Sequence, residues 1–393
     1  MTRLYLDRNA ATPLLPEVLA AMLPFLKESF GNPQSLHRDG QAVLEATEEA
    51  RERVARLIGA AADEIVFTAS GSEANNLAVK GLALASRVKG THVVVSAIEH
   101  PSVLNAVRAL EKLGFSASMV PVDGRGFVDP AAVEKALTPK TTLVSVMLAN
   151  SEVGTIEPVA EIAALCKARN ILVHTDAVAA TGSIPVDVAT LGVDALSLAG
   201  APFYGPKGAA ALFLKKGTRV LPLVDGGIQE SGRRAGTENV AGIVGLGRAA
   251  GIARERLAAR AVREAALRDR LIDGVLGSFD HVILTGPRDR RLPYHASFCV
   301  EFVEGESLLL SLDMKGIAVA SGSACSSKSL KASHVLLAMG LDHALAQGSL
   351  VFSLLESTSA EDIEAVLAAF GPIIDRLRRM SPTYTEFLKE KRT

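Results

Sequence analysis

Short apolar runs alternate with amphipathic stretches through the first two-thirds of the chain. Runs of this length, rich in aliphatic side chains and bounded by turn residues, predict β-strands. The predicted strands cover residues 64–68, 92–96, 117–122, 142–148, 171–175, 195–198 and 210–214. The helical patterns between them include 72–85, 101–113 and 159–169. This alternation predicts an α/β fold with a mostly parallel seven-stranded sheet and helices on both faces.

A helix-favouring stretch over 241–279 predicts a long connection to a smaller α+β domain. The elements predicted there are a strand over 295–302 and helices over 304–315 and 360–380. We therefore expect a large α/β domain over residues 15–258. Residues 1–14 and 259–393 would form the small domain, which carries the loop around Cys325.

The 393 residues are 48% hydrophobic, which is enough for a sizeable core. A net charge of −1 and an aromatic content of 4% predict no nucleic-acid surface and no attraction to an anionic membrane. No apolar run approaches the roughly 18 residues of a membrane span, and the first residues lack the apolar stretch of a signal peptide. The three cysteines show no CxxC or disulfide spacing, so we expect a reducing, cytoplasmic location.

The segment Ser70-Gly-Ser-Glu-Ala-Asn follows a predicted strand and opens a predicted helix. Free N–H groups and the positive end of the helix dipole make such a position suitable for a phosphate. The alternative is an ordinary helix start in which Ser72 is the N-cap.

Several short motifs occur in a specific order and spacing. They are YLDRNAATP (5–13), FGNPQSLH (30–37), FTASGSEANN (67–76), EHP (99–101), ANSEVGT (149–155), HTDAV (174–178), GRRAGTENV (232–240), SGSACSS (321–327) and residues 333–340. Through them the chain resembles, over nearly its whole length, the NifS/IscS-type cysteine desulfurases. These are class V, fold-type I enzymes that use pyridoxal 5'-phosphate (PLP). The resemblance implies a fold-type I aminotransferase-like fold and a homodimer.

The resemblance also implies a cofactor site. Gly71 and Ser72 would contact the PLP phosphate, and Thr237 would reach it from the second subunit. His100 matches the histidine that stacks on the pyridine ring, and the resemblance implies that it is also a catalytic residue. Asp176 matches the carboxylate that pairs with the pyridinium nitrogen and makes the ring an electron sink. The alternative for an aspartate at a strand end is a simple cap.

Cys325 matches the loop cysteine that attacks the substrate thiol and carries the persulfide. Glycine and serines surround it, which is typical of an exposed loop rather than a packed core. It could also be a metal ligand, if a partner protein shares an iron–sulfur cluster with it. Cys166 and Cys299 lie in apolar helix and strand patterns, which predict buried thiols.

The chain departs from the family pattern at the segment LAGAPFYGPKG (198–208), where the family has roughly SGHKFYGPKG. Pro202 stands at the position of the lysine that forms the Schiff base with PLP, and proline has no primary amine. Ala201 stands at the position of the preceding histidine. Ala199 replaces a serine that binds the phosphate.

Three further departures affect the ring and the substrate. Ser151 and Ala179 replace an asparagine and a glutamine that contact the ring hydroxyl. Val351 replaces the arginine that clamps the substrate carboxylate. Four lost cofactor hydrogen bonds of roughly 1 to 1.5 kcal/mol each would weaken cofactor binding by about three to four powers of ten.

Three functional hypotheses follow. In the first, the protein has lost PLP-dependent desulfurase activity. Cys325 then serves sulfur transfer or iron–sulfur assembly with a scaffold or sulfur-acceptor protein. In the second, a displaced amine supports the PLP reaction that turns L-cysteine into L-alanine, and Lys207 is the nearest candidate. In the third, the altered pocket carries a new enzyme activity.

Overall fold

A computed structural model describes residues 3–322 and 332–391. Its largest sheet has seven strands in the order β2-β8-β7-β6-β5-β3-β4, and only β8 runs antiparallel to its neighbours. The strands are β2 (Ile65–Thr68), β3 (His92–Ser96), β4 (Ser116–Val120), β5 (Thr141–Ser145), β6 (Leu172–Asp176), β7 (Ala195–Ala199) and β8 (Ala210–Leu214). All seven predicted strands are confirmed, two of them with the same ends and five with ends that shift by a few residues.

Helices cover both faces of this sheet because alternate side chains along each strand point to opposite sides. On β3, Val93 and Val95 pack into the same core as α3 (Gly71–Ala85) and α4 (Pro101–Lys112). Val94 faces the other core. The helices on that second face include α2 (Arg38–Leu57), α5 (Pro130–Ala136), α6 (Val159–Lys167), α7 (Val188–Leu191) and the first part of α8 (Val240–Ser278).

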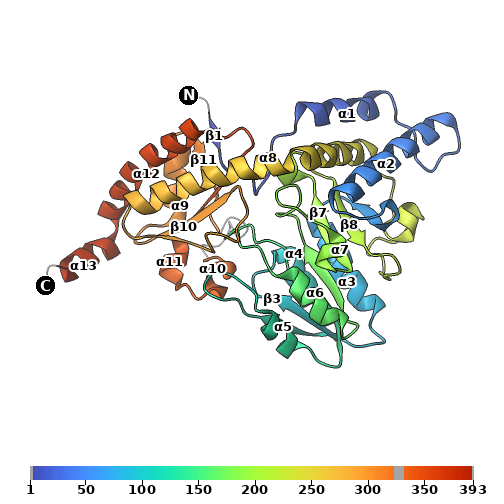
Figure 1. Cartoon of the computed structure of the whole chain (residues 1–393), viewed down its shortest axis with the longest axis horizontal. Helices are drawn as coiled ribbons and strands as arrows, with labels where there is room; N and C mark the ends of the chain where they lie inside the picture. Colours follow the sequence, from blue (N-terminus) through green and yellow to red (C-terminus); the bar gives the residue numbers. More distant parts are fainter. Residues whose placement is uncertain (1–2, 323–331, 392–393) are drawn as a thin grey trace.

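Helix α8 joins the large lobe to the small one and runs below α1 (Pro16–Lys27) and α12 (Ala360–Met380) in the view of Figure 1. Its 39 residues confirm the long helix predicted over 241–279. The helix passes through residue 258 without a break, and the exact domain division stays a prediction.

The small lobe is built on a three-stranded antiparallel sheet in the order β12-β10-β9. A short β1–β11 pair ties the N-terminal segment to this lobe (Figure 1). The elements are β1 (Leu4–Tyr5), β9 (Val282–Leu284), β10 (His295–Val300), β11 (Ile317–Ala318), β12 (Ser349–Ser353), α9 (Gly305–Asp313), α10 (His334–Ala338), α11 (His343–Gln347), α12 (Ala360–Met380) and α13 (Pro382–Glu390). The strand and two helices predicted here are confirmed as β10, α9 and α12.

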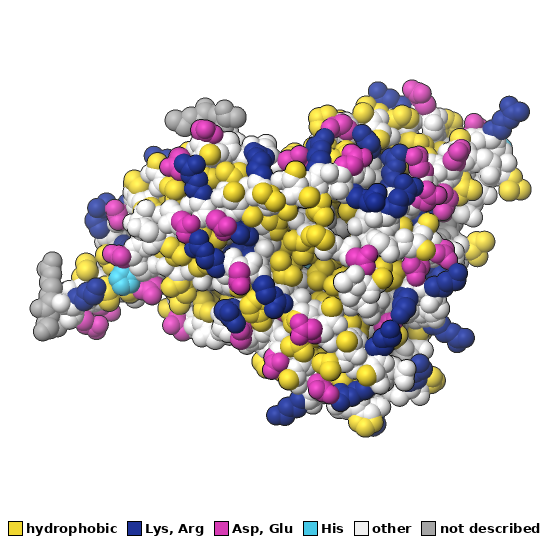
Figure 2. Space-filling model, in the orientation of Figure 1, with side chains coloured by type: hydrophobic (Ala, Val, Ile, Leu, Met, Phe, Trp, Pro, Cys, Tyr) yellow, Lys and Arg dark blue, Asp and Glu magenta, His cyan; other side chains and the backbone are white. Residues whose placement is uncertain are grey.

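The remaining elements lie on the large lobe and in its loops. They are α1 (Pro16–Lys27) and the short 3-10 helices η1 (Ala62–Glu64), η2 (Ala201–Phe203) and η3 (Gln229–Gly232). On the face shown in Figure 2, basic and acidic side chains are interspersed, as the net charge of −1 suggests. Within residues 3–322 and 332–391, no helix combines the length and apolar composition that crossing a membrane requires.

Candidate functional site

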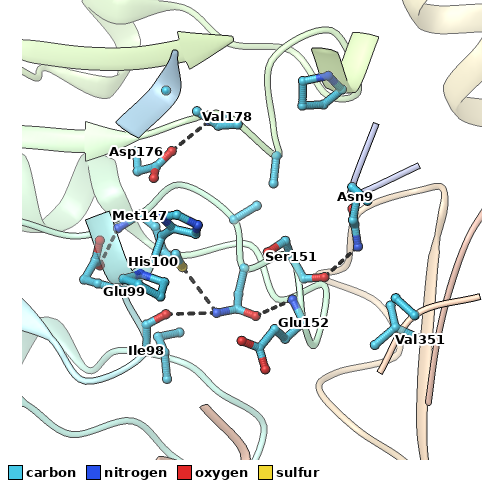
Figure 3. Close-up of a pocket in the computed structure, with 18 of the residues that line it drawn as sticks. Asn9, Ile98, Glu99, His100, Met147, Ser151, Glu152, Asp176, Val178 and Val351 are labelled. Carbon is cyan, nitrogen blue, oxygen red and sulfur yellow. Dashed lines mark hydrogen bonds between the residues drawn. The ribbon is translucent and has the colours of Figure 1, made fainter. Parts of the chain in front are cut away.

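A cavity of about 310 Å³ lies at the carboxyl ends of the parallel strands, where the two lobes meet. This is the edge at which open α/β sheets bind their ligands. The large lobe supplies the loops that follow β2, β3, β5, β6 and β7. The small lobe supplies β12, and the N-terminal segment closes one side. Figure 3 shows Val351 and Asn9 on the opposite side of the cavity from His100 and Asp176.

Most of the predicted site residues line this one cavity. They are Gly71, Ser72, His100 and Asp176, together with the altered positions Ser151, Ala179, Pro202 and Val351. Parts of the chain that lie hundreds of residues apart thus meet where the sequence motifs predicted a common site.

Three predicted residues do not line the cavity. Ala199 is buried at the end of β7, and its Cβ lies 3.6 Å from where a Cβ on Gly71 would be. The carbonyl of Ala201 accepts a hydrogen bond from the Thr12 hydroxyl at 2.7 Å. Thr237 is exposed on the loop between η3 and α8.

Cys325 lies outside the described residues. The other two cysteines are buried and free, which confirms the prediction for them. Burial raises the thiol pKa to about 12 for both Cys166 and Cys299. Neither side chain therefore supplies a thiolate at neutral pH.

Asp176, at the end of β6, is held by two hydrogen bonds. The Val178 N–H donates to Oδ1 at 2.9 Å, and Asn75 Nδ2 donates to Oδ2 at 2.6 Å (Figure 3 shows the first). Asn75 Nδ2 also donates to Ser102 Oγ at 2.9 Å, and this hydroxyl lies 2.7 Å from His100 Nδ1. Asp176 and His100 therefore belong to one hydrogen-bonded network that fixes both side chains.

Burial raises the pKa of Asp176 above its ordinary value, while the Val178 N–H, the charge of His100 and the Asn75 amide lower it. A cationic partner would stabilise the ionised form of this carboxyl. Asp176 is thus a buried, hydrogen-bonded carboxyl at the cavity wall, and its pairing with a protonated ring nitrogen stays a prediction of the resemblance.

The N-terminus of α3 borders the cavity next to Asp176. Ser70 is the N-cap, because its Oγ accepts a hydrogen bond from the Glu73 N–H at 3.1 Å. The alternative in which Ser72 caps the helix is therefore wrong, since Ser72 lies one residue inside the first turn. A Cβ on Gly71 would lie 2.8 Å from Val178 Cγ2, so a glycine is needed for this close approach.

Pro202 lies in η2 with its side chain buried, and its carbonyl accepts a hydrogen bond from Arg8 Nε at 3.1 Å. Lys207, the candidate for a displaced amine, is exposed and does not line the cavity. Among the described residues that line the cavity there is no lysine and no arginine.

The residues present therefore match only part of a PLP site. The network around Asp176 and His100 fits the ring, and the start of α3 offers N–H groups to a phosphate. An amine that could anchor the cofactor covalently is absent from the described lining. The described part of the lining thus does not fit a covalently held PLP.

Sequence reasoning missed several polar residues that line the cavity. They are Asp7, Asn9, Asn75, Glu99, Asn150 and Glu152. Each lies inside or beside a motif already recognised. The pattern of residue types could not show that their side chains converge on one space, because that depends on how the loops of different strands meet.

The chain matches the family model "Aminotransferase class-V" over residues 4–366. It is 49% identical to the cysteine desulfurase IscS of Dictyoglomus turgidum over 389 aligned residues, and the alignment covers 99% of each chain. It is 47% identical over 391 residues to the cysteine desulfurase IscS of Clostridium botulinum, covering 99% of this chain and 98% of the relative.

The fold is also similar to solved structures of such proteins. A NifS-like protein superposes with a TM-score of 0.89 at 36% identity, covering 96% of this chain and 99% of that one. The apo structure of a cysteine desulfurase from Thermococcus onnurineus has a TM-score of 0.85 at 26% identity, covering 95% of each chain.

Proposed function

We propose that this chain, which belongs to the class-V aminotransferase family and within it to the NifS/IscS-type cysteine desulfurases, has lost PLP-dependent desulfurase activity. PLP is the cofactor expected for this family. In our proposal the protein acts in sulfur transfer or iron–sulfur assembly, and Cys325 carries the sulfur or ligates a cluster together with a partner protein.

One observation carries the proposal. Pro202 occupies the position that the resemblance assigns to the Schiff-base lysine, and the described lining of the cavity offers no other primary amine. Lys207, in the same segment, is exposed and does not line this cavity. Without an amine, neither the covalent attachment of the cofactor nor a lysine-mediated proton transfer has an agent.

Absorbance spectroscopy tests the loss of the cofactor linkage. The purified protein is scanned from about 300 to 600 nm with and without added PLP, then treated with borohydride and mapped for a modified lysine. We expect no band near 390–420 nm that borohydride fixes to the chain. A fixed lysine adduct in the unaltered protein would refute the proposal and identify the displaced amine.

A matched pair of variants shows whether Pro202 alone limits attachment. Pro202→Lys restores an amine, and Pro202→Met supplies a flexible side chain without one. If the retained half of the site still holds the ring, only Pro202→Lys gains the borohydride-sensitive band. Desulfurase activity in the unaltered protein, measured as alanine released from cysteine, would contradict the proposal independently of the spectrum.

The sulfur-carrier role is tested at Cys325. A donor persulfide would transfer its outer sulfur to the Cys325 thiolate and leave as the thiol, with no net oxidation. Mass spectrometry should then find an added sulfur on Cys325 and none after Cys325→Ser. Bound iron with broad absorption above roughly 400 nm, lost in the same variant, would instead assign the cluster role.

We also propose that the protein is a cytoplasmic homodimer. Thr237 is exposed and does not line the cavity of its own chain, so the role that the resemblance gives it requires a second copy. Light scattering on the purified protein measures the mass directly. A monomer at micromolar concentration would contradict this part of the proposal.

A further inference from the structure

The two stretches of chain that flank Cys325 meet at one carboxyl group. Gly322 is the last described residue before the segment 323–331, and Ser333 lies just after it. A Cβ on Gly322 would lie 3.1 Å from Glu152 Oε2 and 3.3 Å from Ser333 Cβ. The Ser333 hydroxyl donates a hydrogen bond to the same Oε2 atom. The chain thus enters and leaves the segment 323–331 at the same place, beside Glu152.

The end at Gly322 is fixed to the wall of the main cavity. Its N–H donates to Ser349 Oγ at 3.2 Å, and the backbones of Ala320 and Val351 exchange hydrogen bonds at 3.1 and 2.8 Å. Ser349 and Val351 lie on β12, and Ala320, Gly322 and Val351 line the cavity. Cys325 follows Gly322 by three residues, and a stretch of that length spans at most about 11 Å. Holding Gly322 therefore limits the region that the thiol can reach.

The end at Ser333 is fixed by the start of a helix. Ser333 is the N-cap of α10, and its Oγ accepts hydrogen bonds from the N–H groups of Val335 at 3.1 Å and Leu336 at 3.4 Å. The hydroxyl has one hydrogen to donate, and Glu152 Oε2 accepts it. Ser333 is 4% exposed, so water competes little for this contact. One serine thus joins α10 of the small lobe to Glu152 of the large lobe.

The turn that carries Glu152 is itself held by three neighbours. Asn150 Oδ1 accepts a hydrogen bond from the Glu152 N–H at 2.8 Å. The Ser151 carbonyl accepts from Asn9 Nδ2 at 2.7 Å, and His295 Nε2 lies 2.9 Å from the same oxygen (Figure 3 shows the bonds at Asn9 and Glu152). The backbone beneath the Glu152 side chain is therefore fixed relative to both lobes.

The contact between Glu152 and Ser333 needs an acceptor rather than a full negative charge. Burial raises the pKa of the Glu152 carboxyl to about 7, and the hydrogen bond from Ser333 lowers it. A hydroxyl can donate to either form of the carboxyl, because the neutral form keeps a carbonyl oxygen. Glutamine keeps such an oxygen and should preserve the contact, whereas leucine has a similar volume and no acceptor.

We propose that Glu152 is a positioning residue for Cys325. By accepting the Ser333 hydroxyl and lying against Gly322, it keeps both ends of the segment 323–331 at the cavity wall. Joining the ends of a stretch of chain reduces the number of conformations open to the residues between them. The inference rests on the proposed sulfur role for its purpose, since a thiol that exchanges sulfur with a partner must be presented at a defined place.

A nitroxide spin label on Cys325 tests this positioning. The other two cysteines, Cys166 and Cys299, are buried, and their thiol pKa values of about 12 should prevent labelling. Electron paramagnetic resonance then measures how fast the label tumbles. We expect its rotational correlation time to fall by about twofold or more in Glu152→Leu and to change little in Glu152→Gln. An unchanged spectrum in Glu152→Leu, or an equal change in both variants, would overturn the proposal.

Ser333→Ala removes the other half of the contact, but it also removes a helix cap. Ser359→Ala is the matched control, because Ser359 is the N-cap of α12 and does not line the cavity. Only Ser333→Ala should mobilise the label. The double variant Glu152→Leu/Ser333→Ala should mobilise it no further than either single change, because both remove the same contact. Additive effects, or an equal effect of Ser359→Ala, would overturn the proposal.

The spectrum and the sulfur assay can fail independently. The label reports the position of Cys325 whether or not sulfur binds there. Absence of added sulfur on Cys325 would therefore refute the sulfur role and leave the positioning by Glu152 intact. An unchanged spectrum in Glu152→Leu would refute the positioning and leave the sulfur role intact.

Discussion

Replacing Arg8 by methionine should destabilise the protein by about 3–5 kcal/mol, because it removes one partner of a buried ion pair. Arg8 is completely buried, and its Nη1 donates to Glu264 Oε1 at 2.8 Å. Its Nη2 donates to Ser183 Oγ at 2.8 Å and its Nε to the Pro202 carbonyl at 3.1 Å. The guanidinium also lies 4.0 Å from the centroid of the Tyr294 ring.

The structure indicates the lower part of that range. Arg260 Nε lies 3.9 Å from Glu264 Oε1, so the carboxylate keeps one cation after Arg8 is removed. The methionine side chain still fills most of the volume, which limits the cavity that remains. The remaining loss comes from the weakened pairing of Glu264 and from the two acceptors left without the guanidinium. We therefore expect about 3 kcal/mol.

Urea unfolding followed by circular dichroism measures the difference, provided that the slope with denaturant is unchanged. Arg3→Met is the matched control. Its ion pair with Asp313, at 2.6 Å, has side chains that are 67% and 49% exposed, and its loss should cost at most about 1 kcal/mol. A loss in Arg8→Met no larger than that in Arg3→Met would refute the reasoning. The double variant Arg8→Met/Glu264→Leu should regain part of the stability, because it removes both charges of the pair while Arg260 keeps Glu356 Oε2 at 3.6 Å.

Two further predictions concern the walls of the cavity. Because burial raises the pKa of Glu99 to about 8 and that of Glu152 to about 7, the stability that these protonated groups contribute is complete at acid pH and is lost as the pH rises through those values. The buried His174, whose pKa is lowered to about 3, makes stability rise with pH below pH 6.5, so the decline should be clear only above that value. Unfolding curves should therefore show stability falling from about pH 6.5 to 8.5, with a shallower slope in Glu99→Gln. An equal slope in the variant would contradict this prediction. Gly71→Ala should lower the urea midpoint of unfolding, because the new Cβ would lie 2.8 Å from Val178 Cγ2. Adding Val178→Ala should recover much of the loss. An unchanged midpoint in the single variant would show that the Val178 side chain shifts at no cost.

Local sequence patterns were sufficient for the elements and for much of the site. The alternation of apolar runs predicted β8 over 210–214 and α12 over 360–380 with the ends that the structure has. The motifs placed His100 and Asp176 in one site, and the structure brings both to the same cavity. These predictions succeed because strand and helix periodicity, and short motifs at strand ends, are properties of neighbouring residues.

The sequence by itself determined the family, the seven-stranded sheet, and the identity of Pro202 and Val351 at positions where the resemblance expects cations. Only the tertiary structure decided that Glu99, to which the sequence assigned no role, lines the same cavity as those two residues and has a buried oxygen with no hydrogen-bond partner in the described part of the chain. Likewise, it alone paired Arg8 with Glu264, 256 positions away. Neighbouring residues set the local conformation of a chain. The charge balance of a cavity is set by side chains that meet only after folding, and their local sequence carries no signal of the partner they will have.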